Sequence, residues 1–263
     1  MTTRLLGAFS TLLFAAPPAL VVLTPVVVLA HGGPPARLAL LYAVGAGTAA
    51  VAVMGFFYRA MAIGKISIVT PIASCGALLP IVVGLLRGER PGTLQLGGMA
   101  LALVGIVLVS IEAEKGGGKV RLVAGVGLAA VAAMAYGVWA MLIKQASTVD
   151  PYWASLANRA TTLSLLLAAA ALYRVRRKAI ALPARSWRQI APLAGIGIFG
   201  SVGDLLFAIG TTRGLLSVVA LIGSMYPLVT VGLATIVLKE RLVRYQTVGV
   251  VSALAGIALL STR

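Results

Sequence analysis

The stretch FFYRAMAIGKISIVTPIASCGALLP, residues 56–80, recurs in diverged form later in the chain. The second copy is LFAIGTTRGLLSVVALIGSMYPLVT, residues 206–230, at an offset of 150. Residues that match at this offset, or at 151 after one inserted residue, include Phe57 and Phe207, Gly64 and Gly214, Ser74 and Ser224, Glu89 and Glu240, Gln95 and Gln246, Gly98 and Gly249, and Gly105 and Gly256. An internal repeat sets the architecture before other features are interpreted. The chain is therefore predicted to contain two versions of one structural unit.

The composition excludes a water-soluble fold. Of the 263 residues, 60% are hydrophobic and only 11% are charged, with a mean hydropathy of +1.04. Soluble domains carry roughly 25% charged residues, so this chain has too few to cover a soluble core. An integral membrane protein is the class that fits.

The net charge of +16 does not indicate nucleic-acid binding, because the cations lie between apolar runs, as orientation signals do in membrane proteins. The single cysteine, Cys75, excludes an intrachain disulfide. The N-terminal apolar run is longer than that of a signal peptide and is interrupted by Pro17 and Pro18, which predicts a retained helix.

Long apolar runs predict membrane-spanning helices, since about 20 such residues cross a bilayer and runs of this length exclude barrel strands. Nine stretches qualify, at residues 4–30, 37–62, 65–87, 92–112, 120–144, 151–174, 189–213, 214–238 and 243–261. Prolines are expected to kink three of these helices. The first contains Pro17, Pro18 and Pro25, the third contains Pro71 and Pro80, and the eighth contains Pro227. Bent helices at matching positions of two repeats point to a transport site.

The repeat predicts an all-α polytopic membrane protein with two inverted halves. Equivalent helices are five apart, and an odd number of crossings turns the second copy upside down in the membrane. The first repeat covers residues 1–112 with four helices, residues 113–119 form a linker, and residues 120–263 hold five helices. Substrate is expected near the midplane.

The first repeat thus lacks the counterpart of the helix at residues 120–144. Two explanations remain open: the chain begins at an internal methionine of a ten-helix protein, or it is a nine-helix variant. The upstream reading frame would decide between them. A missing helix would leave a gap that a homodimer could fill.

The distribution of Lys and Arg predicts the orientation. Fifteen of these cations fall on one side of the predicted helices and six on the other, with the loop at residues 174–188 contributing most. By the positive-inside rule, the N-terminus lies in the cytoplasm and the C-terminus outside.

The segments GLLRGERPGTLQLGGMALALVGIVL (residues 84–108) and IVLKERLVRYQTVGVVSALAGIALL (residues 236–260) share a Glu-Arg loop, a Gln and a glycine-rich helix. In these features the chain resembles the EamA repeat of the drug/metabolite transporter superfamily. The resemblance implies ten helices in two five-helix repeats, a cell inner-membrane location and movement of small metabolites, often as efflux. It also implies that both ends lie in the cytoplasm, whereas the charge count places this C-terminus outside.

Few residues are available for catalysis. The chain has six acids and one histidine, with no Cys/His cluster for zinc and no nucleophile elbow or phosphate-binding loop. We therefore expect neither an enzyme nor a primary pump, and no cofactor or metal.

Asp204 stands out because it lies in the middle of the predicted seventh helix, where a lone carboxylate costs at least about 2.5–3.5 kcal/mol to insert. One interpretation is a proton or cation site, since desolvation favours the neutral carboxyl group and lets it cycle. The other is a structural carboxylate hydrogen-bonded to Ser201, Asn158 or Arg159. Arg159 either clamps a substrate carboxylate or extends to the membrane interface.

Other polar residues at depth are candidates for substrate contact. Tyr136 and Trp139 lie one turn apart and either stack on a flat or cationic substrate or serve packing and the interfacial belt. The hydroxyls beside the paired kinks belong to Thr70, Ser74, Ser224 and Tyr226. The Glu-Arg pairs at residues 89–90 and 240–241 are expected to fix loops through local ion pairs.

Together these features predict a secondary transporter or exporter of small organic metabolites or drug-like amines. It would work by alternating access, with proton exchange through Asp204 or without coupling. An uncoupled facilitator and a non-transporting membrane scaffold are the alternatives.

Overall fold

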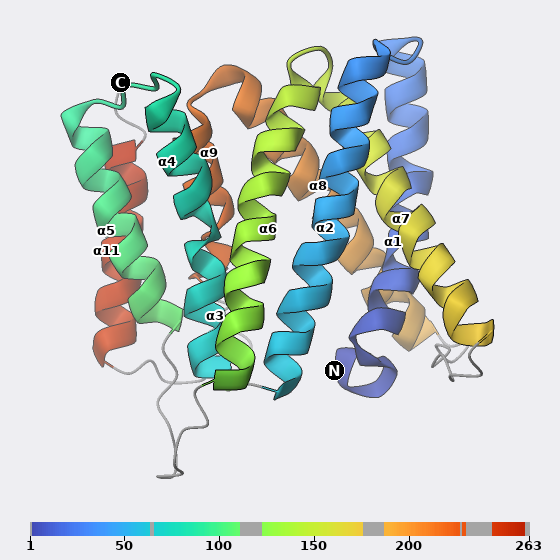
Figure 1. Ribbon diagram of the computed structural model, residues 1–263, viewed down its shortest axis with the longest axis horizontal. Helices are drawn as coiled ribbons and strands as arrows, with labels where there is room; N and C mark the ends of the chain where they lie inside the picture. The colour runs from blue at the N-terminus through green and yellow to red at the C-terminus, as the bar shows by residue number, and fades with distance from the viewer. Residues whose placement is uncertain are drawn as a thin grey trace. The chain divides into compact units, whose positions relative to one another are not determined.

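The computed structural model describes residues 2–63, 66–110, 123–175, 187–226, 228–229 and 244–260, and every regular element in these ranges is helical (Figure 1). In chain order the elements are α1 (Thr2–His31), α2 (Arg37–Ile63), α3 (Ile66–Ser74), the 3-10 turn η1 (Cys75–Ala77), α4 (Leu78–Leu86), α5 (Thr93–Ser110), α6 (Val123–Ser147), α7 (Pro151–Val175), α8 (Trp187–Arg213), α9 (Leu216–Gly223) and α11 (Arg244–Leu260).

The all-α, multi-pass prediction is confirmed. Within the described ranges, five helical segments are long and apolar enough to cross a membrane, and they are Phe9–Leu29, Arg37–Ile63, Gly125–Ser147, Pro151–Tyr173 and Ile190–Arg213. Shorter apolar helices cover Ile72–Leu86, Thr93–Leu108 and Arg244–Leu260. The predicted linker at 113–119, most of the basic loop at 174–188, and the Glu240–Arg241 pair lie outside the described residues, as does the end of the predicted span 214–238.

The third predicted helix is broken, as its prolines suggested. α3 ends at Ser74, η1 follows, and α4 resumes at Leu78 with Pro80 in its first turn, where a proline leaves no intrahelical donor missing. In the equivalent part of the second repeat, α9 ends at Gly223. α1, by contrast, is helical throughout its three prolines.

The helices group into two compact units. Unit 1 contains residues 1–51 and 141–213, and unit 2 contains residues 52–140 and 214–263. The boundary falls inside α2 and inside α6. Each unit therefore combines helices from both predicted repeats.

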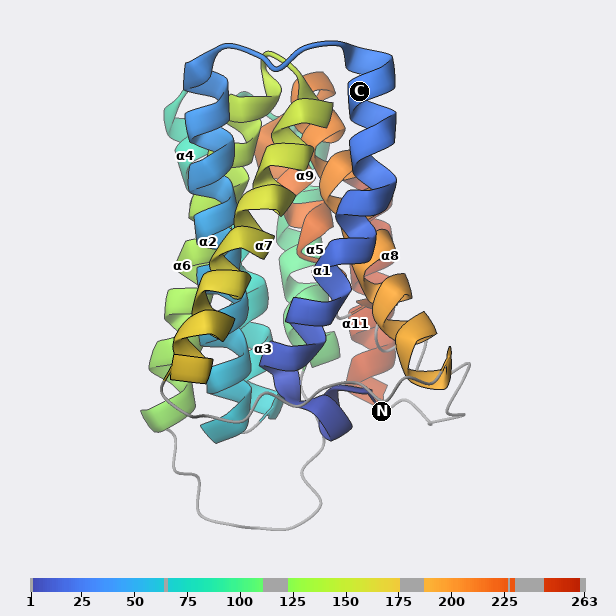
Figure 2. The same ribbon diagram turned by 90° about the vertical axis from the view of Figure 1, so that its right-hand side faces the viewer.

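In unit 1, α1, α7 and α8 pack on one another (Figure 2). A small residue allows the closest approach, because a Cβ atom at Gly197 of α8 would collide with the carbonyl oxygen of Ala15 in α1. Close backbone contact of this kind supplies packing energy where lipid removes the hydrophobic drive between helices. Apolar clusters complete the α1–α7 contact, one of them formed by Leu13, Ala16, Leu166 and Ala170.

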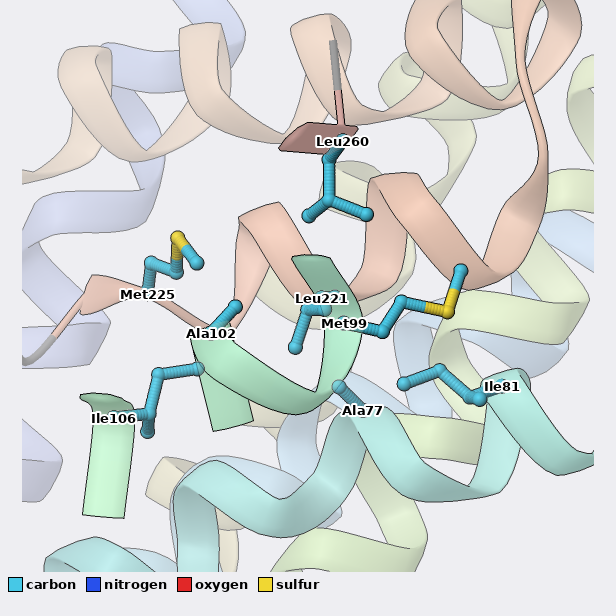
Figure 3. Close-up of a cluster of buried hydrophobic side chains, with 8 residues drawn as sticks. All are labelled: Ala77, Ile81, Met99, Ala102, Ile106, Leu221, Met225 and Leu260. Carbon is cyan, nitrogen blue, oxygen red and sulfur yellow. The ribbon is translucent and has the colours of Figure 1, made fainter. Parts of the chain in front are cut away.

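In unit 2, the repeat-equivalent helices α5 and α11 pack side by side (Figure 1). A Cβ at Gly98 would lie 2.9 Å from Gly256 O, and a Cβ at Gly105 would lie 2.7 Å from Gly249 O. Since Gly98 is equivalent to Gly249 and Gly105 to Gly256, the pairing is antiparallel and locally twofold. The adjoining core, shown in Figure 3, consists of Ala77, Ile81, Met99, Ala102, Ile106, Leu221, Met225 and Leu260.

A carboxylate from the first repeat caps a helix of the second. Glu89 Oε1 accepts the backbone N–H of Leu216 at 2.9 Å, and Oε2 accepts that of Ser217 at 3.1 Å. These amides begin α9, whose own N-cap residue, Leu215, makes no side-chain cap. A negative charge at a helix N-terminus satisfies unpaired donors and complements the helix dipole. Glu89 was predicted to fix its own loop through a local ion pair. The structure shows that it also has a hydrogen-bond partner 127 residues away.

Glu89→Gln is expected to lower the free energy of unfolding by about 1–3 kcal/mol. The glutamine oxygen can accept one of the two amides, but its NH2 group would face the other donor. Thermal unfolding of the detergent-purified protein measures the loss. The exposed neighbour Arg87, changed to Gln, serves as the control. Equal stability of the Glu89→Gln variant and the wild type would show that the cap contributes nothing.

Candidate functional site

A polar stripe runs along α7, the helix that carries the predicted site residues Asn158 and Arg159. Ser155, Asn158 and Thr162 are spaced three and four residues apart, which places them on one helical face, and all three are buried. The two hydroxyls are satisfied within the helix: Ser155 Oγ donates to Pro151 O at 2.9 Å and Thr162 Oγ1 to Asn158 O at 2.9 Å. The Asn158 side chain is left to make contacts with other helices.

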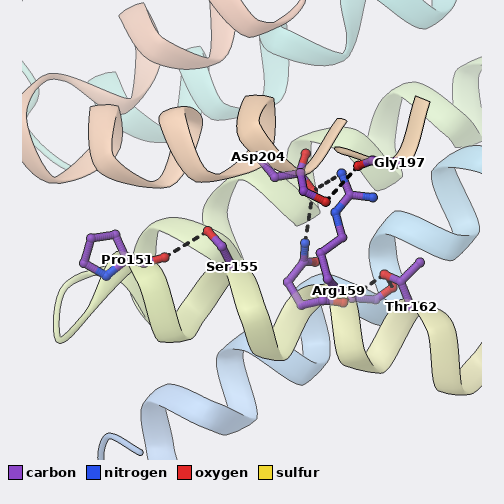
Figure 4. Close-up of polar contacts among 9 residues, drawn as sticks. Pro151, Ser155, Arg159, Thr162, Gly197 and Asp204 are labelled. Atoms are coloured by element: carbon purple, nitrogen blue, oxygen red, sulfur yellow. Dashed lines mark hydrogen bonds and ion pairs between the residues drawn. The ribbon is translucent and has the colours of Figure 1, made fainter. Parts of the chain in front are cut away.

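Asp204 of α8 meets Arg159 and Asn158 of α7 in an ion-pair cluster (Figure 4). Arg159 Nη2 lies 2.9 Å from Asp204 Oδ2, and Asn158 Nδ2 donates to the same oxygen at 3.3 Å. The side chains of Arg159 and Asp204 retain 12% and 25% of their accessible surface. The ion pair is therefore largely buried, although part of each side chain remains accessible.

Gly200 makes room for the guanidinium. A Cβ atom at Gly200, one turn before Asp204, would lie 3.2 Å from Arg159 Nη2. The absence of a side chain there lets α8 present its backbone to the guanidinium of α7. Ser201, the other partner considered for Asp204, instead donates its hydroxyl to Gly197 O at 2.9 Å.

Among the residues that the structure describes, two buried atoms of this cluster have no hydrogen-bond partner. They are Asn158 Oδ1, an acceptor, and Arg159 Nε, a donor. Asn158 has no exposed surface. An unsatisfied buried polar atom costs about 1–3 kcal/mol, so this pair of atoms needs an explanation beyond the stability of the fold.

The carboxyl group of Asp204 can be ionised or protonated, so the net charge of the cluster can change by one. With Asp204 ionised, the pair is neutral and Asn158 adds a hydrogen bond to the carboxylate. With Asp204 protonated, the Arg159 charge would have no counter-ion in this pair. The arrangement supports both open interpretations of Asp204, a cycling proton site and a structural ion pair. It also gives Arg159 a partner within its own unit.

The predicted hydroxyl residues lie in unit 2. Ser74 Oγ donates to Thr70 O at 2.9 Å and lies 3.2 Å from the hydroxyl of Tyr226. The ring of Tyr226 packs edge-on against Phe57, with centroids 6.4 Å apart. Ser224 donates to Leu221 O at 2.8 Å, at the end of α9. The break in α3 and the end of α9 are thus joined by Ser74 and Tyr226.

The aromatic pair of α6 is anchored in the same unit. The rings of Tyr136 and Trp139 lie 5.5 Å apart at 34°, and Trp139 is buried. The Tyr136 hydroxyl donates to Ala220 O of α9 at 3.1 Å. This hydroxyl ties α6 to a helix that follows it by more than 80 residues.

Sequence reasoning missed a second polar cluster, at the end of α1. His31 Nδ1 lies 3.2 Å from Asp150 Oδ2, and the His31 ring stacks on Tyr152 with centroids 3.8 Å apart. Asp150 Oδ1 also accepts the backbone N–H groups of Tyr152 and Trp153, at 2.7 and 3.0 Å. The Asp-Pro start of α7 was a signal for the cap, but nothing local indicated His31 as its partner.

Comparison with known proteins gives a family match and matches to solved structures. A family model described as the EamA-like transporter family matches residues 123–262, while no curated protein matches the chain. A solved crystal structure superposes with a TM-score of 0.76 at 18% sequence identity, covering 99% of this chain and 90% of its own. At that identity, the likeness is one of fold.

Proposed function

Because the chain belongs to the EamA-like transporter family, whose members are membrane transporters and not enzymes, we propose that it is a proton-coupled secondary transporter of a small organic metabolite. It works by alternating access in the cell inner membrane, with export as the direction the resemblance favours. The prediction of two inverted repeats supports this mechanism. The antiparallel, twofold pairing of α5 with α11 is the contact that such a repeat would produce.

The single observation that carries the proposal is the ion pair of Arg159 and Asp204. Both residues belong to helices long and apolar enough to span a membrane. Ionisable residues inside such spans are costly, and they commonly mark proton relays or substrate pathways. Asp204 is the proton carrier in this proposal, with Asn158 and Arg159 as its partners. The candidate substrate contacts of unit 2 are Thr70, Ser74, Tyr136, Trp139, Ser224 and Tyr226.

Asp204→Asn is expected to abolish substrate-driven proton movement, because the amide cannot release a proton at any working pH. Purified protein is reconstituted in liposomes with a trapped pH dye and challenged with amino acids, polyamines, monocarboxylates and aromatic cations. Wild-type protein should give a pH signal with one substrate class, and the variant should give none. Proton movement at the wild-type rate in Asp204→Asn would remove the proton role from this residue.

The two alternatives have distinct outcomes in the same liposomes. An uncoupled facilitator, in which the ion pair of Arg159 and Asp204 is purely structural, would take up labelled substrate without a pH signal. A membrane scaffold would show neither uptake nor proton movement.

A further inference from the structure

We propose that Arg159 is the binding site for the carboxylate of an organic monoanion, which replaces Asp204 at the guanidinium once Asp204 is protonated. Proton and anion would then cross the membrane together. This inference rests on the proposed function and adds the substrate class and the coupling rule.

The donor side of the site is incomplete in the ion pair. The contact that joins Arg159 to Asp204 uses Nη2, while Nε is buried without a partner. A guanidinium binds carboxylates best through two parallel N–H···O bonds. A free carboxylate that engages Nε together with Nη2 would make such a bidentate pair and would satisfy the orphaned donor.

The acceptor side is incomplete in a complementary way. Asn158 already contacts Asp204 through Nδ2, while Oδ1 of the same amide is buried without a partner. A protonated Asp204 gains one O–H donor. Rotation of the Asn158 amide would bring Oδ1 to that hydrogen. The two unsatisfied atoms thus correspond to the two species that load the site, an anion at Arg159 and a proton at Asp204.

Charge balance links the two events. The other described charges of unit 1 lie at helix ends: Arg37 starts α2, Lys144 is in the last turn of α6, Arg213 ends α8, and His31 at the end of α1 contacts Asp150 at the start of α7. Protonation of Asp204 alone would leave Arg159 without a counter-ion, and uncompensated buried charge is strongly unfavourable. Anion binding without protonation would place two negative groups on one cation. Two states are therefore favoured: the ion pair without substrate, and the site that holds a proton on Asp204 together with an anion at Arg159.

The coupling rule is tested with proteoliposomes that contain a pH dye and a potassium gradient set by valinomycin. The probes are gluconate and 4-hydroxybenzoate as monocarboxylates, and ethanolamine and tyramine as monoamines. Wild-type protein should accumulate a monocarboxylate when a pH gradient is imposed, with one proton per anion and no response to the membrane potential. Because one proton is bound per anion, the apparent Kd should rise about tenfold per pH unit while the empty site is ionised.

Three variants separate the roles. Asp204→Asn mimics the protonated carboxyl group, so it should still take up the monocarboxylate, but without drive from the pH gradient and with a new dependence on membrane potential. Arg159→Gln should lose uptake, whereas Arg159→Lys, which keeps the charge but not the fork, should bind more weakly. Arg213→Gln, an exposed cation of α8, is the matched control and should behave as wild type.

The outcomes distinguish this inference from the proposed function. Asp204-dependent proton movement with the monoamines and none with the monocarboxylates would overturn the anion site and leave proton-coupled transport standing. Uptake of the monocarboxylate that remains coupled to protons in Asp204→Asn would overturn the exchange mechanism. Absence of Asp204-dependent transport with every probe would reject both proposals.

Discussion

Arg159→Gln is expected to destabilise the protein by about 3–5 kcal/mol, the usual result of removing one partner from a buried ion pair. The loss comes mainly from Asp204, which has only 25% of its side-chain surface accessible and would lose the guanidinium 2.9 Å away, so that its carboxylate must either stay charged without a counter-ion or take up a proton. Asn158 would retain its single hydrogen bond to the carboxylate, which cannot replace the charge. Heating of the detergent-purified variant, with the folded fraction measured by size-exclusion chromatography, gives the change.

The double variant Arg159→Gln/Asp204→Asn tests whether the stability loss is caused by an uncompensated charge. If the penalty is an uncompensated charge, removing both charges should recover part of the stability, and the double-mutant cycle should show a coupling of about 0.5–3 kcal/mol. Additive losses would mean that the two side chains contribute separately, through packing, and that the ion pair has no energetic role.

Gly105→Leu is expected to disrupt the pairing of α5 with α11 and to cost about 3 kcal/mol or more, since overpacking of this contact can be relieved only by separating two helices. A Cβ at Gly105 would lie 2.5 Å from Ala253 N and 2.7 Å from Gly249 O. Both atoms belong to the backbone of α11, so no side chain can rotate away. The same thermal measurement should show a lower midpoint and a smaller folded fraction.

Gly97→Leu is the matched control on the same helix. A Cβ at Gly97 meets nothing within 4 Å, and the residue is exposed in its unit. The substitution should leave stability close to wild type, because a leucine there faces the surroundings of the unit. Similar losses for Gly97→Leu and Gly105→Leu would show that glycine matters for the helix backbone in general and not for this contact.

Much of the fold could be predicted from local sequence. Each of the nine predicted apolar stretches contains helix in the part of the chain that the structure describes, and the proline-rich third stretch is broken between Pro71 and Pro80. Gly98 and Gly105 recur in the second copy as Gly249 and Gly256, and the structure places all four glycines where α5 and α11 meet. These features depend on hydropathy and backbone chemistry, which act over a few residues.

Which helices pack together could not be predicted from local sequence. The repeats were predicted as the contiguous segments 1–112 and 120–263, whereas the compact units each draw on both. Pairing of α5 with α11 joins equivalent helices across the repeat, whereas α4 packs against α9, which is the counterpart of α3. Sequence similarity identifies equivalent segments, but only side-chain packing determines which segments become neighbours.

The sequence by itself determined that this chain is a helical membrane protein with an internal repeat and with one acid, Asp204, deep in an apolar helix. The tertiary structure decided which of three candidate neighbours that acid would contact, selecting Asn158 and Arg159 while Ser201 bonds within its own helix. It likewise directed Glu89 to α9 and His31 to Asp150. The physical reason is that hydrophobicity and repeat symmetry are properties of the chain, whereas a charge acquires its role from groups brought within hydrogen-bonding distance by packing.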